Sequence, residues 1–515
     1  MRRRDLLLAA ASLGPALIGC GSEHAAAGPA PKLAPPAPKT RPGLGLAYFS
    51  SFGVDEKLIR EGLAAALSRG AERADLYFQH RVSTWISLED GEVNRASTVV
   101  ELGVGVRAVR GDQTGYAYTE ELTLDAVKSA GATAAVVASG PARGAPSSYR
   151  TGLLTRRFAA KVGWDGVGAS QRLPLLSELD KAIRAGDPRI KTVKASLGSE
   201  HGAILIVDSE GRVFEDLLPM AVLYASCTAE ENGRRETNGY NVAGRAGFEF
   251  FTKERLGRVA KQCVDRTTVL FQSVPAPPGE MPVVLAAGAS GILLHEAIGH
   301  GMEADFNRKN TSIYADRIGK PIAKDLVHIV DDGTLEGARG SIDVDDEGNA
   351  SQKTLLVDKG VLATYLHDSI SAKQYGLAPT GSGRRESFRF PPMPRMRSTY
   401  MLPGPHDPAE IIASVKKGIY CERFSNGQVE IGAGDFTFYV KNGRLIEDGK
   451  LTRPITDVNL IGNGPKVLEK IDMVGKTLEF DEGGWTCGKN GQSVPVSLGM
   501  PTVRVASMTV GGRKS

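Results

Sequence analysis

The sequence predicts an α+β protein in which an N-terminal mixed α/β domain precedes a β-rich domain. Three observations support this fold class. A chain of 515 residues is too long for one ordinary hydrophobic core. Helical and alternating apolar patterns mix in the first half, whereas short alternating segments with turn residues dominate the second. A proline-rich stretch, Phe271–Gly279, separates the halves, so we expect domains over residues 45–272 and 280–515.

The first 44 residues are predicted to be a targeting sequence and a tether. Arg2–Arg4 precede a short apolar run, as in a signal peptide over residues 1–19, and they resemble a twin-arginine export signal. Leu17–Cys20 resembles a bacterial lipobox, whose cysteine is lipidated. Residues 20–44 are rich in Ala, Pro and Gly, which is typical of a flexible tether. We therefore expect an exported protein that a lipid on Cys20 anchors to the periplasmic or cell-surface side of a bacterial membrane.

The segment after the tether mixes helical and strand-like spacing of apolar residues. Asp90-Gly91 between two alternating runs is a hairpin signal, and turn residues at 198–202 separate two later strands. We expect helices over 54–67, 124–139, 173–185 and 255–266, and strands over 74–81, 84–89, 99–109, 115–119, 191–197, 203–209 and 212–228.

After the proline-rich break the pattern is mostly that of strands. Pro282–Ala286 predicts a short buried strand, and Ser290 can cap the helix that follows it. Residues 409–417 have the spacing of the one later helix. The strands are separated by four turn signals: Asp332-Gly333, Lys359-Gly360, Asn442-Gly443 and Asp448-Gly449.

Charge and cysteine content argue against two classes of protein. The net charge is +4, and residues 1–19 contribute +2 of it (three Arg minus one Asp), so the remainder carries only +2. With no interleaved basic and aromatic stripe, we expect no binding to nucleic acid. Beyond Cys20 there are four scattered cysteines, which is not the dense framework of a small disulfide-stapled protein.

The motif that organises the chain lies in Gly291–Glu303, where His295, Glu296 and His300 follow an apolar lead-in. Two imidazoles and a carboxylate so close together predict a metal-binding helix of a zinc hydrolase, with Glu296 as general base. The histidines are five residues apart, which places their rings about 140° apart on a regular α-helix. A π-type turn, or a helix end at Gly299, would bring both rings to one ion. The spacing leaves both possibilities open.

A catalytic zinc needs three protein ligands and one open position. Glu303 and Asp305 follow the second histidine closely and are local candidates for the third ligand. Cys487 is a distant candidate in the glycine-rich stretch Gly483–Gly491, where Lys489 would favour its thiolate. The residues alone leave the third ligand open.

The motif, together with Cys487-Gly-Lys-Asn-Gly-Gln492, resembles the TldD branch of the TldD/PmbA (TldE) peptidases, over about residues 50 to 510. The resemblance implies a zinc-dependent endopeptidase with a modified H-E-x-x-x-H motif. It implies that His295, His300 and Cys487 are the metal ligands. It also implies that Glu296 is the catalytic base. Supporting stretches are Gly103–Arg107, Gly383–Arg385, Arg395–Tyr400, Asp435-Phe436 and Leu445–Lys450.

The resemblance also implies a substrate and a partner. The substrates would be unfolded peptides or small proteins, and the β-rich domain suggests that they bind in extended form as an added strand. We expect a homodimer or a heterodimer with a TldE-like partner. The only membrane contact that we expect is the lipid anchor on Cys20.

Two other functions fit the same residues. The first is a binding or assembly protein with a structural zinc, in which Glu303 or Asp305 would close the fourth position. The second is a zinc amidohydrolase that acts on non-peptide substrates.

Overall fold

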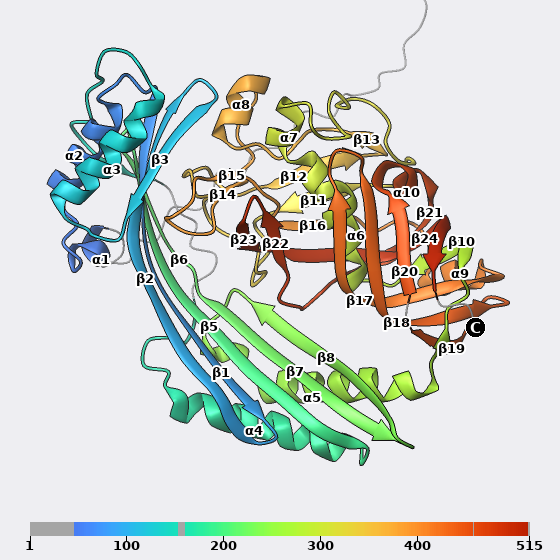
Figure 1. Cartoon of the computed structure of the whole chain (residues 1–515). Coiled ribbons are helices and arrows are strands. Elements are labelled where there is room, and N and C mark those ends of the chain that lie inside the picture. The colour runs from blue at the N-terminus through green and yellow to red at the C-terminus, as the bar shows by residue number, and fades with distance from the viewer. Residues whose placement is uncertain (1–45, 153–159, 457, 513–515) are drawn as a thin grey trace, which may run out of the picture. The chain divides into compact units, whose positions relative to one another are not determined.

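The computed structural model describes residues 46–152, 160–456 and 458–512 (Figure 1). The predicted signal peptide over residues 1–19, the lipidated Cys20 and the tether over residues 20–44 lie outside this part. Among the described residues, no helix combines the length and the apolar character needed to cross a membrane. Two large sheets with flanking helices make up the described chain, which confirms the α+β class.

The first sheet has eight strands, all from the first half of the chain. Its order is β3-β2-β1-β5-β6-β4, and β7 pairs with β5 and with β8. The strands are β1 (Arg73–Glu89), β2 (Glu92–Arg110), β3 (Gln113–Thr119), β4 (Arg150–Thr151), β5 (Ile190–Asp208), β6 (Arg212–Leu217), β7 (Met220–Glu231) and β8 (Arg234–Gly244).

Helices cover one face of this sheet, because alternate side chains of β1 are apolar and point the same way. Leu76 packs with the first three helices, and Ile86, further along the strand, packs with the next two. Tyr77 points to the opposite face and packs against Phe388 from the second half of the chain. The helices are α1 (Leu46–Ser50), α2 (Glu56–Leu67), α3 (Leu124–Ala134), α4 (Ala169–Gly186) and α5 (Lys253–Thr268).

The hairpin at Asp90-Gly91 is present, and both residues have positive φ. Three other predicted breaks between strands are wrong. Residues 82–83 continue β1, residues 198–202 continue β5, and Asn442-Gly443 lies inside β18 (Asp435–Glu447). Each of these segments is paired with a strand on both sides, so sheet pairing overrides the turn preference of their small and polar residues.

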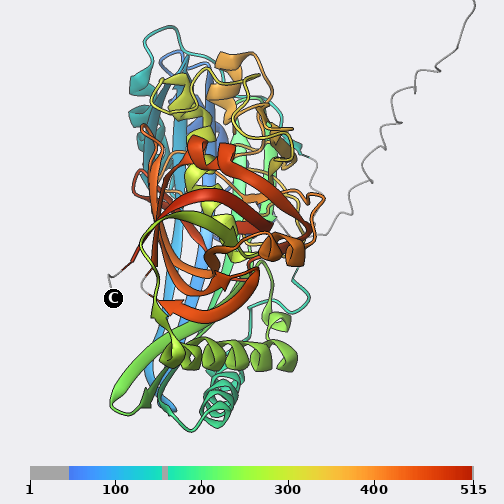
Figure 2. The ribbon, with the colours of Figure 1, turned by 90° about the vertical axis from the view of Figure 1, so that its right-hand side faces the viewer.

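The second sheet has twelve strands, and Figure 2 shows them curving strongly. Its order is β13-β12-β11-β16-β24-β10-β17-β18-β19-β9, β20 bridges β18 and β24, and β21 pairs with β24. The strands are β9 (Val274–Pro275), β10 (Gly279–Leu285), β11 (Ile329–Asp332), β12 (Lys353–Asp358), β13 (Val361–Leu362), β16 (Ser398–Met401), β17 (Lys417–Glu430), β18 (Asp435–Glu447), β19 (Lys450–Thr456), β20 (Val458–Asn463), β21 (Ile471–Phe480) and β24 (Ser497–Gly511).

Short helices and two small ribbons accompany this sheet. The later helices number more than the one predicted, since α8 and α10 form as well as α9. The helices are α6 (Ile292–Leu294), α7 (Ala304–Arg308), α8 (Ser369–Tyr375), α9 (Pro408–Ala413) and α10 (Gly464–Lys470); the ribbons pair β14 (Gly383–Arg384) with β15 (Met393–Pro394), and β22 (Thr486–Lys489) with β23 (Gln492–Pro495).

Buried ion pairs join the two halves of the chain. Arg107 of β2 donates from Nε to Asp75 at 2.7 Å and from Nη1 to Glu347, which follows β11 in the chain, at 2.6 Å. Burial alone would raise the pKa of Glu347, but Arg107 and Arg73 hold it at about 2. The carboxylate therefore stays charged inside the protein, where it depends on its arginine partners.

Replacement of Arg107 by Met should lower the melting temperature strongly. It leaves two buried carboxylates short of their partner, which costs about 3–5 kcal/mol. Arg60→Met is the matched control, because Arg60 pairs with Glu56 at 3.9 Å on the surface and should cost below about 1 kcal/mol. Calorimetry measures the melting temperatures of the two variants, and equal melting temperatures would contradict this account.

Candidate metal centre

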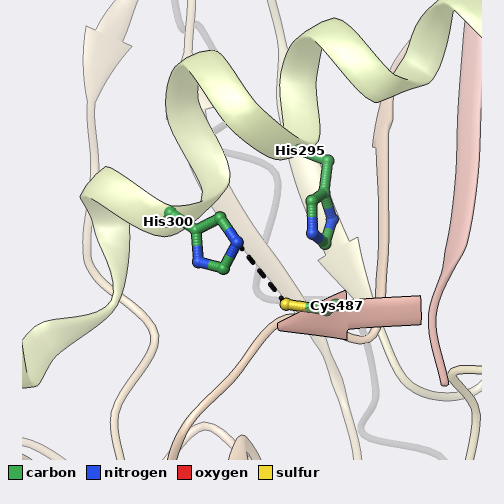
Figure 3. Close-up of side chains that lie close together, drawn as sticks. All are labelled: His295, His300 and Cys487. Atoms are coloured by element: carbon green, nitrogen blue, oxygen red, sulfur yellow. Dashed lines mark hydrogen bonds between the residues drawn. The ribbon is translucent and has the colours of Figure 1, made fainter. Parts of the chain in front are cut away.

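The two motif histidines lie on a helix that changes its winding between them. α6 passes into a π-helix over His295–Gly299, and a 3-10 turn follows over His300–Met302. The backbone N–H of His300 donates to the carbonyl of His295, five residues earlier. The wider turn brings the ring centroids to 5.0 Å, and Figure 3 shows both rings on one side of the helix. Of the two geometries that the spacing left open, the chain adopts the π-turn.

Close packing around small residues accompanies the π-turn. Gly299 lies against Met396 so tightly that a Cβ there would overlap the methionine sulfur. Ile292, Leu293 and Leu294 enter the main core of the second sheet just before the turn. The apolar lead-in of the motif therefore fixes the helix, and the glycine lets a buried side chain approach the turn.

Cys487 reaches the histidines from the ribbon of β22 and β23. Asn490 and Gly491 form its tight turn with positive φ, so side chains alternate between its two faces. Cys487 and Lys489 on one face are buried, whereas Thr486 on the other face is exposed. The structure thus brings together the three residues predicted as metal ligands. Of these, His300 and Cys487 lie 187 residues apart in the chain.

The three side chains form a compact, buried group of donor atoms. One atom from each of His295, His300 and Cys487 lies within 4.8 Å of the others, and exposed fractions are 2%, 5% and 1%. Sγ of Cys487 is 3.6 Å from Nε2 of His300 (Figure 3). Nδ1 of His295 is buried without a hydrogen-bond partner. A buried, orphaned imidazole nitrogen beside a thiol and a second imidazole fits a metal ion that prefers N and S ligands.

Glu303 and Asp305 lie outside this group of donor atoms. Oε2 of Glu303 accepts from Nδ1 of His300 at 3.0 Å and forms an ion pair with Lys489 at 3.1 Å, and Nε of Arg395 lies 3.8 Å from Oε1. Asp305 accepts from Lys489 at 2.7 Å. A carboxylate that holds Nδ1 leaves Nε2 of the same histidine for a metal, as in many metal sites. The sequence offers Glu303 as a candidate ligand and carries no signal of its contact with His300.

Electrostatics makes the group suited to a cation. Burial would lower the pKa of His300, but Glu303 and Cys487 outweigh it and raise that pKa well above its ordinary value. Burial would raise the pKa of the Cys487 thiol, but His295 and His300 hold it well below its usual range. Lys489, which was expected to favour the thiolate, contacts Glu303 and Asp305 instead. The two shifts have opposite directions: they favour the protonated imidazole of His300 and the thiolate of Cys487.

Glu296 is half-buried next to this group and makes no hydrogen bond to another described residue. Burial raises its pKa, although His295 and His300 counteract this effect. A carboxylate with a raised pKa is a better proton acceptor than one held by a salt bridge, which is the property that a general base needs.

The comparisons with known proteins cover most of the chain. Family models match as PmbA/TldA metallopeptidase domain 1 over residues 74–138, the central domain over 163–271 and the C-terminal domain over 278–512. The metalloprotease TldD homolog of Haemophilus influenzae is 41% identical over 452 residues, which cover 86% of this chain and 94% of that protein. The chain belongs to the TldD/PmbA family of metallopeptidases.

Two further TldD/PmbA relatives bear on the metal and the fold. A zinc metalloprotease TldD homolog of Saccharolobus solfataricus is 34% identical over 235 residues, which cover 45% of this chain and 52% of that protein. The crystal structure of TldE from Thermococcus kodakarensis has the same fold, with a TM-score of 0.68 and 19% identity over 89% of this chain and 99% of that one. The metallopeptidase prediction is confirmed, and a metal ion goes with it. The division into domains over residues 45–272 and 280–515 stays a prediction.

The prediction of an exported lipoprotein with a signal peptide and an anchor on Cys20 is wrong. The relatives that match most of the chain are named as metalloproteases, and none of these names gives an export signal or an anchor. The prediction rested on a few arginines, a short apolar run and one cysteine, a pattern too short to be specific.

Gly299→Ala should disturb the π-turn, because its methyl group would overlap the buried Met396 side chain. We expect a loss of about 1–3 kcal/mol in stability. The double variant with Met396→Ala should recover part of this loss, since it opens space for the methyl group. Thermal melting of the two single variants and the double variant measures the coupling, and strictly additive losses would contradict the close contact.

Proposed function

We propose that this TldD-type metallopeptidase uses zinc, held by His295, His300 and Cys487, to hydrolyse unfolded peptides or small proteins. The convergence of these three donor atoms within 4.8 Å carries the proposal. Two imidazoles and a thiolate suit zinc, and a relative carries zinc in its name. A bound zinc ion would polarise the scissile carbonyl and lower the pKa of a water molecule.

The surrounding residues have separate roles in the proposed reaction. Glu303 accepts from Nδ1 of His300 and so presents Nε2 to the site. Lys489 and Arg395 hold the pKa of Glu303 low, at about 2 despite its burial, so that it stays ionised. Glu296 would accept a proton from the attacking water and later deliver it to the leaving amine.

An open ligand position would distinguish a zinc peptidase from a protein with a structural zinc. Among the described residues the group of possible ligands has three members, which is the number typical of catalytic zinc. Glu303 and Asp305, which could have closed the fourth position, are engaged by His300, Lys489 and Arg395. This arrangement favours the peptidase over the binding or assembly protein.

Substrate form and assembly are part of the same proposal. The β-rich architecture favours a peptide bound in extended form, which requires an unfolded substrate segment. The fold that the chain shares with TldE motivates a homodimer or a heterodimer with a TldE-like partner. A zinc amidohydrolase acting on non-peptide substrates is the alternative, and digestion of a peptide library with and without chelator separates the two.

Glu296→Gln should keep zinc and lose cleavage by about 10²–10⁴-fold, because the amide cannot accept the proton. Glu303→Gln is the contrasting variant: it should weaken zinc binding by about 10–100-fold, because the ligand histidine loses its ionised partner. Zinc titration and peptide cleavage are measured on both. Full activity of the Glu296 variant would remove that residue as the base.

Zinc affinity should rise with pH, because His300 must lose a proton to bind metal. The raised pKa of His300 favours its protonated form, whereas the lowered pKa of Cys487 favours its thiolate. We expect release of about one proton per zinc and an affinity that changes by up to about tenfold per pH unit. Calorimetry in buffers of different ionisation enthalpy counts the protons. An affinity that does not change between about pH 6 and pH 8 would contradict the prediction.

A further inference from the structure

A cavity of about 520 Å³ lies between the ribbon that carries Cys487 and the first sheet. Trp85 and Val99 from β1 and β2 and Glu200 from β5 line it on the side of the sheet. Thr486 and Ser493 line it on the side of the ribbon, on the ribbon face opposite to Cys487. The cavity thus touches the same two strands that hold the proposed metal ligand.

Arg339 reaches into this cavity without a counterion. Its Nε is buried and has no hydrogen-bond partner, and within the described ranges no ion pair of this residue is found. Two other arginines of the cavity are matched, since half-buried Arg81 pairs with Glu101 and buried Arg385 pairs with Asp75. Burial lowers the pKa of Arg339 to about 10, so the side chain is still charged at neutral pH.

Arg339 as a whole is half-buried, but its Nε is buried and unmatched, and leaving such a donor without an acceptor is costly. A guanidinium presents two parallel N–H groups that match a carboxylate. Glu200 lies in the same cavity and attracts Arg339, but it makes no ion pair with it in the structure. The guanidinium is therefore available to an anion from outside the chain.

Arg339 also lies close to the segment of the chain that leads to Cys487. A Cβ on Gly484 would lie 2.6 Å from Nη1 of Arg339, so the guanidinium packs against the backbone at Gly484. Gly484 is three residues before Cys487, and three residues of extended chain span at most about 11 Å. A peptide bound at the metal could therefore place a carboxylate at Arg339 within about four residues of the scissile bond.

We propose that Arg339 anchors a carboxylate-binding subsite, and that this cavity receives a carboxylate of the peptide substrate. The carboxylate comes from an acidic side chain or from the C-terminus of the peptide. The inference rests on the proposed peptidase function, and it makes Arg339 a residue that selects substrates.

Direct binding tests the subsite without cleavage. The zinc-loaded Glu296→Gln protein is titrated with labelled peptides that are identical except for Glu or Gln, three or four residues on either side of the scissile bond. A second pair differs in a free or an amidated C-terminus. We expect about tenfold weaker binding when the carboxylate that Arg339 contacts is removed, and the pair that shows the effect identifies its source. Equal affinities within both pairs, or no binding at all, would overturn the proposal.

Variants at two cavity arginines locate the effect. Arg339→Gln should abolish the preference for the acidic peptide, and Arg339→Lys should keep part of it, because the charge remains without the two parallel donors. Arg95→Gln is the matched control, since Arg95 lines the same cavity but is exposed and should contribute below about twofold. An unchanged preference in Arg339→Gln would overturn the proposal.

The melting temperature separates a selecting residue from a structural one. Because Arg339 has no partner in the free protein, Arg339→Gln should leave the melting temperature unchanged or raise it. A lower melting temperature with loss of zinc would mark the residue as structural and overturn the inference.

Cleavage by the wild type then separates this inference from the proposed function. If the zinc enzyme hydrolyses both peptides of each pair with equal kcat/KM, the subsite is wrong and the peptidase stands. If it binds the acidic peptide better yet cleaves neither, the peptidase is wrong and the subsite stands.

Discussion

The carboxylate of Glu303 is the contact on which the geometry of the centre depends. It is fully buried and joins three segments: the 3-10 turn through His300, the Cys487 ribbon through Lys489, and the chain before β16 through Arg395. Each partner carries or can carry a positive charge, so the one anion sets the distance between the helix and the ribbon. A buried carboxylate with several charge-assisted bonds is rigid, and such rigidity holds metal ligands within the tolerance that catalysis needs.

The first sheet also contributes to the position of Cys487, although its residues are remote from the metal centre in sequence. The segment before β22 docks on the edge of β8: Ala243 donates to the carbonyl of Glu482 at 2.7 Å, and Asn241 accepts from Gly484 at 2.5 Å. Tyr240 adds a bond to the Glu482 side chain at 3.0 Å. The ribbon is therefore held at Lys489 by Glu303 and Asp305, and at its approach by the first sheet, so both halves of the chain position Cys487.

Local patterns in the sequence predicted the parts of the site that depend on local structure. The apolar lead-in and the spacing of His295 and His300 required a distorted helix, and the chain has one. The resemblance of the glycine-rich stretch pointed to Cys487. The bond between Glu303 and Lys489 and the unmatched Arg339 could not be predicted, because they depend on which strands pair across the fold. The false turns in β1 and β5 have the same cause: neighbours on both sides of a strand outweigh its residue preferences.

The long separation between the proposed ligands has a consequence for folding. His300 and Cys487 are 187 residues apart, so their contact closes a loop that contains most of the second sheet. Cys487 comes into contact with His300 only when β22 and β23 reach the helix. A metal that binds all three donors therefore binds the completed fold and stabilises it through mass action. Metal binding thus reports on the docking of the last strands and links the maturation of the site to completion of the chain.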